Sequence, residues 1–121
     1  MFIYMLDRFY LVMDMASQVM VDMPLCGFEA TIKAEKEGGS VKIDITSDCD
    51  QVMKFAEALG EVEMKDVMHI RDNKIMEVAG NYLTPSCLVP CGIMNAARIE
   101  FGLISKRLAM KKGDLRIVFE K

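Results

Sequence analysis

Polar and apolar residues alternate over two neighbouring stretches of the chain, residues 28–34 and 41–46. Alternation with a period of two gathers the apolar side chains on one face, which predicts two β-strands that each bury one face. Residues 35–40 between them contain Gly38-Gly39, which suits a tight turn. Two strands joined by a short glycine-rich turn form an antiparallel hairpin, so we expect a hairpin over residues 28–46.

Apolar residues recur at helical spacing in three later stretches. The first begins after Ser47-Asp48-Cys49-Asp50, whose spacing resembles a capping box, and ends at Gly60. The second follows the capping pair Asp72-Asn73 and is stopped by Pro85. The third starts near Pro90, because proline is tolerated in the first turn of a helix.

Two further stretches complete the prediction of the fold. Residues 61–71 fit a short helix and an irregular strand equally well, whereas residues 114–120 alternate again and predict a closing strand. A hairpin, then helices, then a returning strand are typical of an α+β fold. We expect a two-layer sandwich, with an antiparallel sheet of about three strands (hairpin 28–46 plus C-terminal strand 114–120) packed by three or four helices.

Residues 1–23 hold six of the chain's 12 methionines. Apolar residues recur at helical spacing over residues 2–16, so residues 1–24 are expected to form a Met-rich extension, helical or disordered, ahead of a single α+β domain at 25–121. Three explanations of the extension stay open. It can reflect a start codon upstream of the native one, a helix packed on its own domain, or an adaptable surface for a protein partner or a second copy.

Length and charge restrict the class of protein. A chain of 121 residues is long enough for one domain with its own core, and a net charge of −3 argues against a nucleic-acid binder, which needs a clustered basic surface. The apolar run at residues 1–6 is far shorter than the roughly 18–20 residues that cross a bilayer. No secretory signal is evident, since Asp7, Arg8 and Asp14 interrupt the apolar start. We therefore expect a cytoplasmic protein without a membrane span.

The four cysteines carry the candidate chemistry, because clustered cysteines in a reducing compartment are more often metal-binding or catalytic than disulfide-bonded. Cys26 precedes the first strand of the hairpin and Cys49 follows the second, so both should lie at the same end of the sheet. Cys49 and Cys91 fall at predicted helix N-termini, where the helix dipole stabilises a thiolate, and Cys87 lies one loop away from Cys91. Convergence of all four thiols is the central expectation.

Two glycines follow cysteines directly, Gly27 after Cys26 and Gly92 after Cys91. A residue without a Cβ atom lets backbone amides approach a sulfur atom or a cluster closely. Gly27 and Gly92 are therefore the candidate cofactor-binding residues, beside the candidate metal ligands Cys26, Cys49, Cys87 and Cys91.

An all-thiolate set favours an iron–sulfur cluster or zinc, since thiolates select against magnesium and calcium and the chain has only one histidine. We expect a metal-binding protein that serves electron transfer, cluster handling or structure. A redox enzyme or carrier that uses Cys49 or Cys91 as a low-pKa thiol is the first alternative. A third possibility is that the cysteines are buried and inert, and that the chain is an interaction module that docks through residues 1–23.

Other polar features give weaker signals. The acidic run Glu61, Glu63 and Asp66 is typical of a solvated face, and the single histidine, His69, is by itself weak evidence for a ligand. The chain has no P-loop, no dinucleotide-binding glycine motif and no nucleophilic-serine motif. Whether the protein is an enzyme is left open by these observations.

The segments Cys26-Gly27-Phe28, Ser47-Asp48-Cys49, Cys87-Leu88-Val89-Pro90-Cys91-Gly92-Ile93 and Glu100-Phe101-Gly102-Leu103 resemble a small family of uncharacterised proteins from anaerobic bacteria and methanogenic archaea. The resemblance covers residues 25–121 and leaves the Met-rich segment outside. It implies a small cytosolic α+β protein without an assigned activity, and it favours oxygen-sensitive iron–sulfur chemistry over disulfides. The resemblance also implies that some relatives carry serine in place of Cys91, which would make Cys26, Cys49 and Cys87 the core set.

Overall fold

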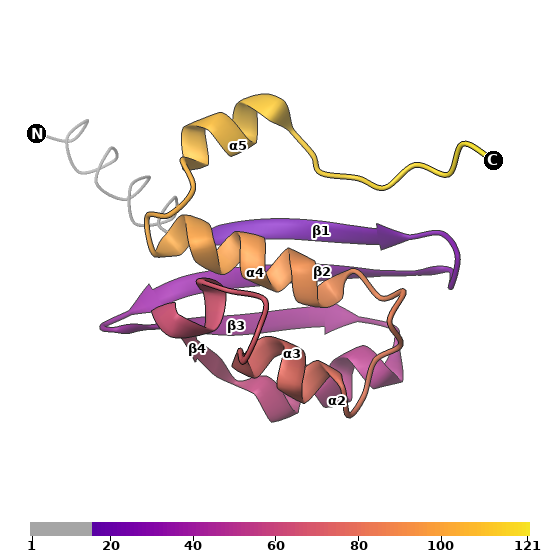
Figure 1. Ribbon diagram of the computed structural model, residues 1–121, viewed down its shortest axis with the longest axis horizontal. Coiled ribbons are helices and arrows are strands. Elements are labelled where there is room, and N and C mark those ends of the chain that lie inside the picture. Colours follow the sequence, from indigo (N-terminus) through magenta and orange to yellow (C-terminus); the bar gives the residue numbers. More distant parts are fainter. Residues whose placement is uncertain (1–15) are drawn as a thin grey trace, which may run out of the picture.

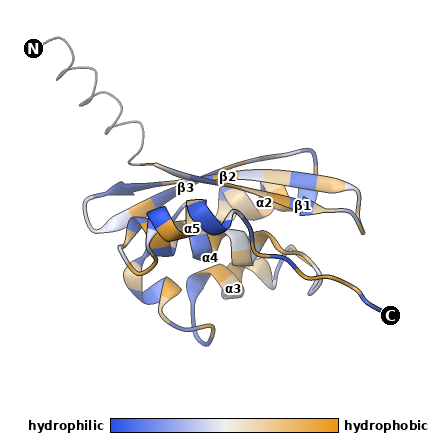
Figure 2. Cartoon of the chain, turned by 90° about the horizontal axis from the view of Figure 1, so that it is seen from above, coloured by the Kyte–Doolittle hydropathy of each residue, from blue (hydrophilic) through white to orange (hydrophobic). Residues whose placement is uncertain are grey.

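The computed structural model describes residues 16–121, which form a two-layer α+β fold. A four-stranded antiparallel sheet makes one layer, and the helices gather against one of its faces (Figures 1 and 2). In chain order the elements are β1 (Ser17–Met23), β2 (Phe28–Glu37), β3 (Ser40–Ser47), α2 (Asp50–Leu59), β4 (Glu61–Glu63), η1 (Met64–Val67), α3 (Lys74–Ala79), α4 (Val89–Glu100) and α5 (Lys106–Lys112). The label η1 denotes a short 3-10 helix. The expected α+β class is confirmed.

The expected hairpin is present as β2 and β3, paired antiparallel with Ala30 opposite Ser47 and Glu37 opposite Ser40. Its alternation works as predicted, because Ile32 and Ile43 are buried against the helices while Lys33 faces solvent. The other face of the sheet, which no helix covers in Figure 2, is therefore polar.

The first strand was not expected. Residues 17–23 were assigned to a helical or disordered extension, but they form β1, which pairs with β2 from Ser17 opposite Ala34 to Met23 opposite Phe28. Val21 and Met23 are buried, so the segment also has a period-two pattern that points its apolar residues toward the core. The sequence pattern did not distinguish this strand from a helix, because its methionines and valines fit both the period of two of a strand and the period of 3.6 of a helix. The expectations for residues 1–15 lie outside the described residues.

The C-terminal strand expected at residues 114–120 was wrong. This segment has no secondary structure, and all its residues are exposed. The fourth strand of the sheet is instead β4 (Glu61–Glu63), which pairs with β3 within the stretch that the sequence left ambiguous. Alternation describes a segment that could lie on a sheet, but it does not determine whether the segment pairs with a strand edge.

Helix α4 lies across β1 and β2, and a glycine allows it to come close (Figure 1). A Cβ atom on Gly92 would lie 2.6 Å from Val21 Cγ2 and 3.0 Å from Ile32 Cδ1. Ile93, Ala96 and their neighbours on the inward face are fully buried. Gly92 therefore serves packing between the helix and the sheet.

No helix within residues 16–121 is long and apolar enough to span a bilayer.

Candidate functional site

Cys26 is held in the turn that joins β1 to β2. The carbonyl of Met23 accepts hydrogen bonds from the backbone N–H groups of Cys26 (3.2 Å) and Gly27 (3.0 Å), and Gly27 adopts a φ of +78°, which favours glycine. The Cys26 thiol also donates to the Met23 carbonyl at 3.5 Å. Cys26 itself is exposed, in this turn between β1 and β2.

Cys49 is the N-cap residue of α2, directly after β3. Its backbone N–H donates to Ser47 Oγ at 3.2 Å, and the Ser47 hydroxyl donates to the Glu29 carbonyl at 2.7 Å. This chain of bonds replaces the capping box expected between Ser47 and Asp50, since the N-cap makes no side-chain hydrogen bond to the helix. It ties Cys49 to the beginning of β2, beside the Cys26 turn.

Cys87 lies in the loop between α3 and α4 and is partly buried. Its backbone N–H donates to the Thr84 carbonyl at 3.1 Å, which closes a turn after Pro85. Its thiol approaches Met23 Sδ at 3.8 Å, so this loop contacts the last residue of β1. Met23 thus joins the Cys87 loop to the Cys26 turn.

Cys26, Cys49 and Cys87 lie at one end of the sheet, which we call the thiol end. The end of β1, the beginning of β2 and the end of β3 lie side by side in the register, and in Figure 1 the loop before α4 reaches the same end. Burial raises the pKa of the Cys87 thiol, a hydrogen bond with the Val89 backbone opposes this, and charge on Cys49 and Cys26 adds to the rise. The expectation that Cys26 and Cys49 share one end of the sheet is confirmed.

Cys91 occupies a different position from the other three. It is the third residue of α4, exposed, with its carbonyl accepting from Asn95 Nδ2 at 2.8 Å. The structure thus places Cys26, Cys49 and Cys87 at one end of the sheet, whereas Cys91 lies on the first turn of α4, directly before Gly92, which packs against the sheet.

The two predicted cofactor-binding glycines use their amides within the chain. Gly27 donates to the Met23 carbonyl at 3.0 Å, and Gly92 donates to the Leu88 carbonyl at 3.0 Å. Neither amide is free for a cofactor while these bonds persist. Within residues 16–121, no group of three or more His, Cys, Asp and Glu side chains is already arranged to hold a metal ion. Metal binding at the thiol end thus requires the Cys26 turn and the Cys87 loop to close further.

The raised pKa of Cys87 predicts a loss of stability at alkaline pH. Below about pH 8.5, the ordinary pKa of a cysteine, both the folded and the unfolded chain hold the proton, and the thiol's contribution is fully present. As pH rises above that value, the unfolded chain releases its proton first, so the free energy of unfolding falls until the folded thiol also titrates. Urea unfolding across this range measures the slope, which should be shallower in Cys87→Ser and unchanged in Cys91→Ser. Equal slopes for the wild type and Cys87→Ser would show the prediction to be wrong.

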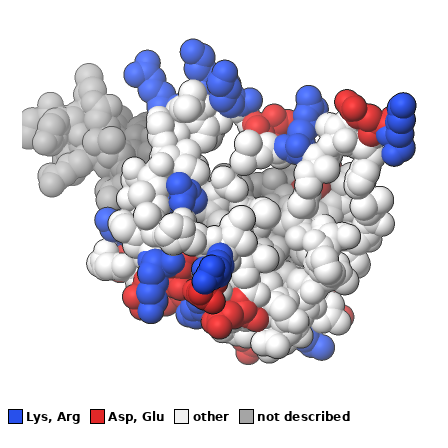
Figure 3. All heavy atoms as spheres, viewed as in Figure 1, with Lys and Arg blue, Asp and Glu red and all other residues white. Residues whose placement is uncertain are grey.

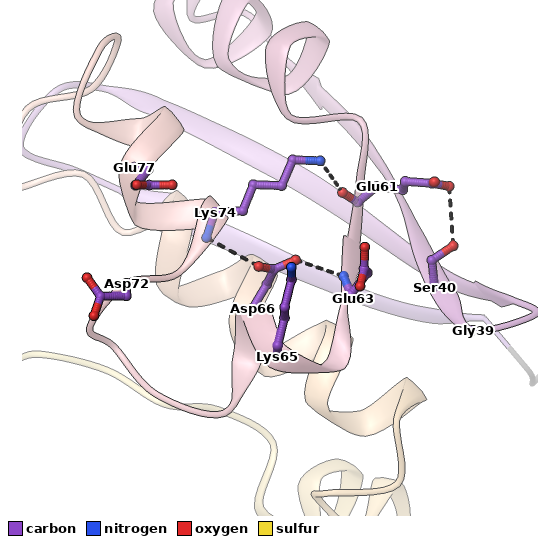
Figure 4. Close-up of a pocket in the computed structure, with 9 residues that line it drawn as sticks. All are labelled: Gly39, Ser40, Glu61, Glu63, Lys65, Asp66, Asp72, Lys74 and Glu77. Carbon is purple, nitrogen blue, oxygen red and sulfur yellow. Dashed lines mark hydrogen bonds between the residues drawn. The ribbon is translucent and has the colours of Figure 1, made fainter.

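A second polar feature lies far from the thiol end and was not predicted from the sequence. An open hollow of about 640 Å³ lies beside the β2–β3 turn, which is at the opposite end of the sheet, and Figure 4 shows its lining. Asp66, expected on a solvated face, is buried: it accepts from the backbone N–H of Glu63 at 2.9 Å and of Lys74 at 3.4 Å. The three-residue spacing of Glu63 and Asp66, a capping box around η1, was the signal. Because Asp66 already has partners, we assign this hollow no ligand.

A family model described as "Family of unknown function (DUF6951)" matches residues 17–112, from the first residue of β1 to the last residue of α5. No curated protein and no solved structure matches the chain.

Proposed function

The chain belongs to this family of unknown function, DUF6951, whose description names no activity, and we propose from the thiol end that the protein binds a soft metal centre. The ligands are Cys26, Cys49 and Cys87, and the centre is an iron–sulfur cluster or zinc. Its role is electron transfer, cluster handling or structural support in the reducing cytoplasm, where free thiols persist.

One observation carries the proposal. Three cysteines from three separate segments, a hairpin turn, the end of a strand and a loop, lie at the same end of the sheet. Thiolates and thioethers are the ligands that soft metals prefer, and the Met23 thioether stands 3.8 Å from the Cys87 thiol.

The state of Cys87 fits a ligand better than a nucleophile. A raised pKa keeps this thiol protonated at neutral pH, which slows attack on a substrate because the thiolate is the reactive form. Metal binding removes the proton directly, so affinity should increase with pH. The Cys26 turn and the Cys87 loop are connecting segments, which can close around a metal without disturbing the paired strands.

The test is metal content after anaerobic purification. We expect iron with sulfide, or zinc, near one centre per chain, and a strong decrease in Cys26→Ser, Cys49→Ser and Cys87→Ser. Cys91→Ser is the matched control, because it removes an exposed thiol on the first turn of α4, outside the proposed ligand set, and it should keep the metal. Cobalt(II) titration gives a second readout, through thiolate-to-metal charge-transfer absorption.

Three outcomes would contradict this assignment. Fresh anaerobic protein without bound metal and without cobalt charge-transfer absorption would exclude the metal site. A metal-free protein in which Cys49 or Cys91 is alkylated fastest at neutral pH would support the thiol enzyme or carrier instead. Loss of metal in Cys91→Ser as complete as in the other variants would restore the four-cysteine set.

A further inference from the structure

The C-terminal segment, residues 113–121, exposes an unusual amount of apolar surface. Leu115, Ile117, Val118 and Phe119 are 81, 68, 64 and 74% exposed, within a segment that has no secondary structure. Burial of such side chains stabilises an assembly, because it removes apolar surface from water. Clustered exposed apolar residues typically mark an interaction site rather than a free surface. This segment therefore has the composition of a strand but no partner strand among the described residues.

Helix α5, which leads into this segment, is similarly unburied. It contains no buried residue, and Leu108 and Met110 are 52 and 73% exposed. Its first residue holds it beside the beginning of β1, since Lys106 Nζ donates to the Ala16 carbonyl at 3.0 Å. The apolar surface thus continues from α5 into residues 113–121.

Strand β1 offers a matching edge. Among the described residues it pairs with β2 only, so its other side presents backbone N–H and C=O groups. It is seven residues long, as is the alternating segment 114–120, whereas β4 at the opposite edge has only three residues. A long open edge is a template for an added strand.

Charge favours contact of α5, which leads into this segment, with the body of another copy. Residues 105–121 contain six Lys and Arg against two Asp and Glu, whereas residues 16–104 contain eight against fourteen. Four of the six basic residues lie in α5, and residues 113–121 are balanced, with two of each sign. Figure 3 shows the basic side chains along the upper margin, over α5 and the C-terminal segment. The basic helix and the acidic body are complementary between two copies of the same chain, and such a contact brings the adjoining C-terminal segment to the second copy.

The direction of the chain favours a second copy over the segment's own sheet. In Figures 1 and 2 the C-terminal segment runs in the same direction as β1, so pairing with its own β1 would be parallel. Parallel pairing is less stable per residue, and the sheet is otherwise antiparallel. A neighbouring copy can present the same segment in the antiparallel direction, and reciprocal exchange closes the assembly as a twofold dimer.

We propose that residues 114–120 add as an antiparallel strand to the free edge of β1 in a second copy of the chain. The dimer then buries the apolar side chains of both C-terminal segments and covers both open edges. This inference does not depend on the metal proposal.

The test combines molecular mass with backbone hydrogen exchange. Light scattering should give twice the mass of one chain for the full protein and the mass of one chain after deletion of residues 113–121. In the full protein the amides of β1 should exchange slowly, and the deletion should accelerate them. Ile117→Asp together with Phe119→Asp should also give a monomer, because the charges cannot be buried, while Arg116→Gln is a matched change on the same segment that should leave the dimer intact.

Three results would overturn the proposal. A full-length protein that is monomeric and whose β1 amide hydrogens exchange rapidly would show that residues 114–120 do not add to the edge of β1. A monomer with protected β1 amides would mean that the segment folds back on its own sheet. A dimer that survives the deletion would place the interface elsewhere, for example in the Met-rich residues 1–15.

Discussion

Replacing Asn73 with alanine should lower the free energy of unfolding by about 2–4 kcal/mol, the largest effect that we predict for a polar residue. Asn73 is only 1% exposed. Its Nδ2 donates to the carbonyls of His69 (2.6 Å) and Ile70 (3.0 Å), and its Oδ1 accepts from Met76 N (2.8 Å). The substitution removes the N-cap of α3 and leaves carbonyl groups of the preceding turn without their donor. Urea unfolding measures the change.

Two further variants separate the roles of Asn73. Serine can still cap α3 but cannot reach back to the two carbonyls, so Asn73→Ser should recover only the capping share, about 1 kcal/mol. Asn81→Ala is the matched control, since Asn81 is exposed beyond the end of α3, and should change stability little. If Asn73→Ser were as stable as the wild type, the turn at His69 and Ile70 would not depend on the side-chain amide of Asn73. The effect matters for function because α3 leads into the loop that carries Cys87.

Replacing Gly92 with alanine should lower the free energy of unfolding by about 1–2 kcal/mol, because the overpacking cost of about 2–3 kcal/mol exceeds the roughly 1 kcal/mol that alanine gains as a helix former. The new Cβ would lie 2.6 Å from Val21 Cγ2 and 3.0 Å from Ile32 Cδ1, so α4 or these side chains must shift. Urea unfolding again reports the loss. The expected sign is the opposite of the usual gain for alanine in a helix.

A double-mutant cycle tests the cause. Val21→Ala removes the closest atom, so it should cost less in the Gly92→Ala background than in the wild type, with a coupling of about 0.5–3 kcal/mol. Gly80→Ala is the control, because its added Cβ would come no closer than 3.4 Å, to a backbone oxygen. Additive effects, or a Gly92→Ala protein as stable as the wild type, would exclude the close contact as the reason for this glycine.

Local signals in the sequence were sufficient for several elements. Alternation on both sides of Gly38-Gly39 determined the hairpin, and Asn73 and Gly60 marked helix ends that the structure retains. The shared position of Cys26 and Cys49 followed from the hairpin alone, because neighbouring antiparallel strands bring those ends together. These features depend on residues close in sequence, so their physical causes can be read there.

Tertiary packing decided the rest. Residues 17–23 have a pattern that fits a helix or a strand, and only the free edge of β2 makes them β1. Residues 114–120 have an equally good strand pattern, but in the described chain they do not pair with any strand. The sequence alone thus determined where the hairpin lies and that Cys26 and Cys49 share one end of it. The structure decided which segments pair with the hairpin's two edges and why Gly92 lacks a side chain, since each depends on contacts between residues far apart in the chain.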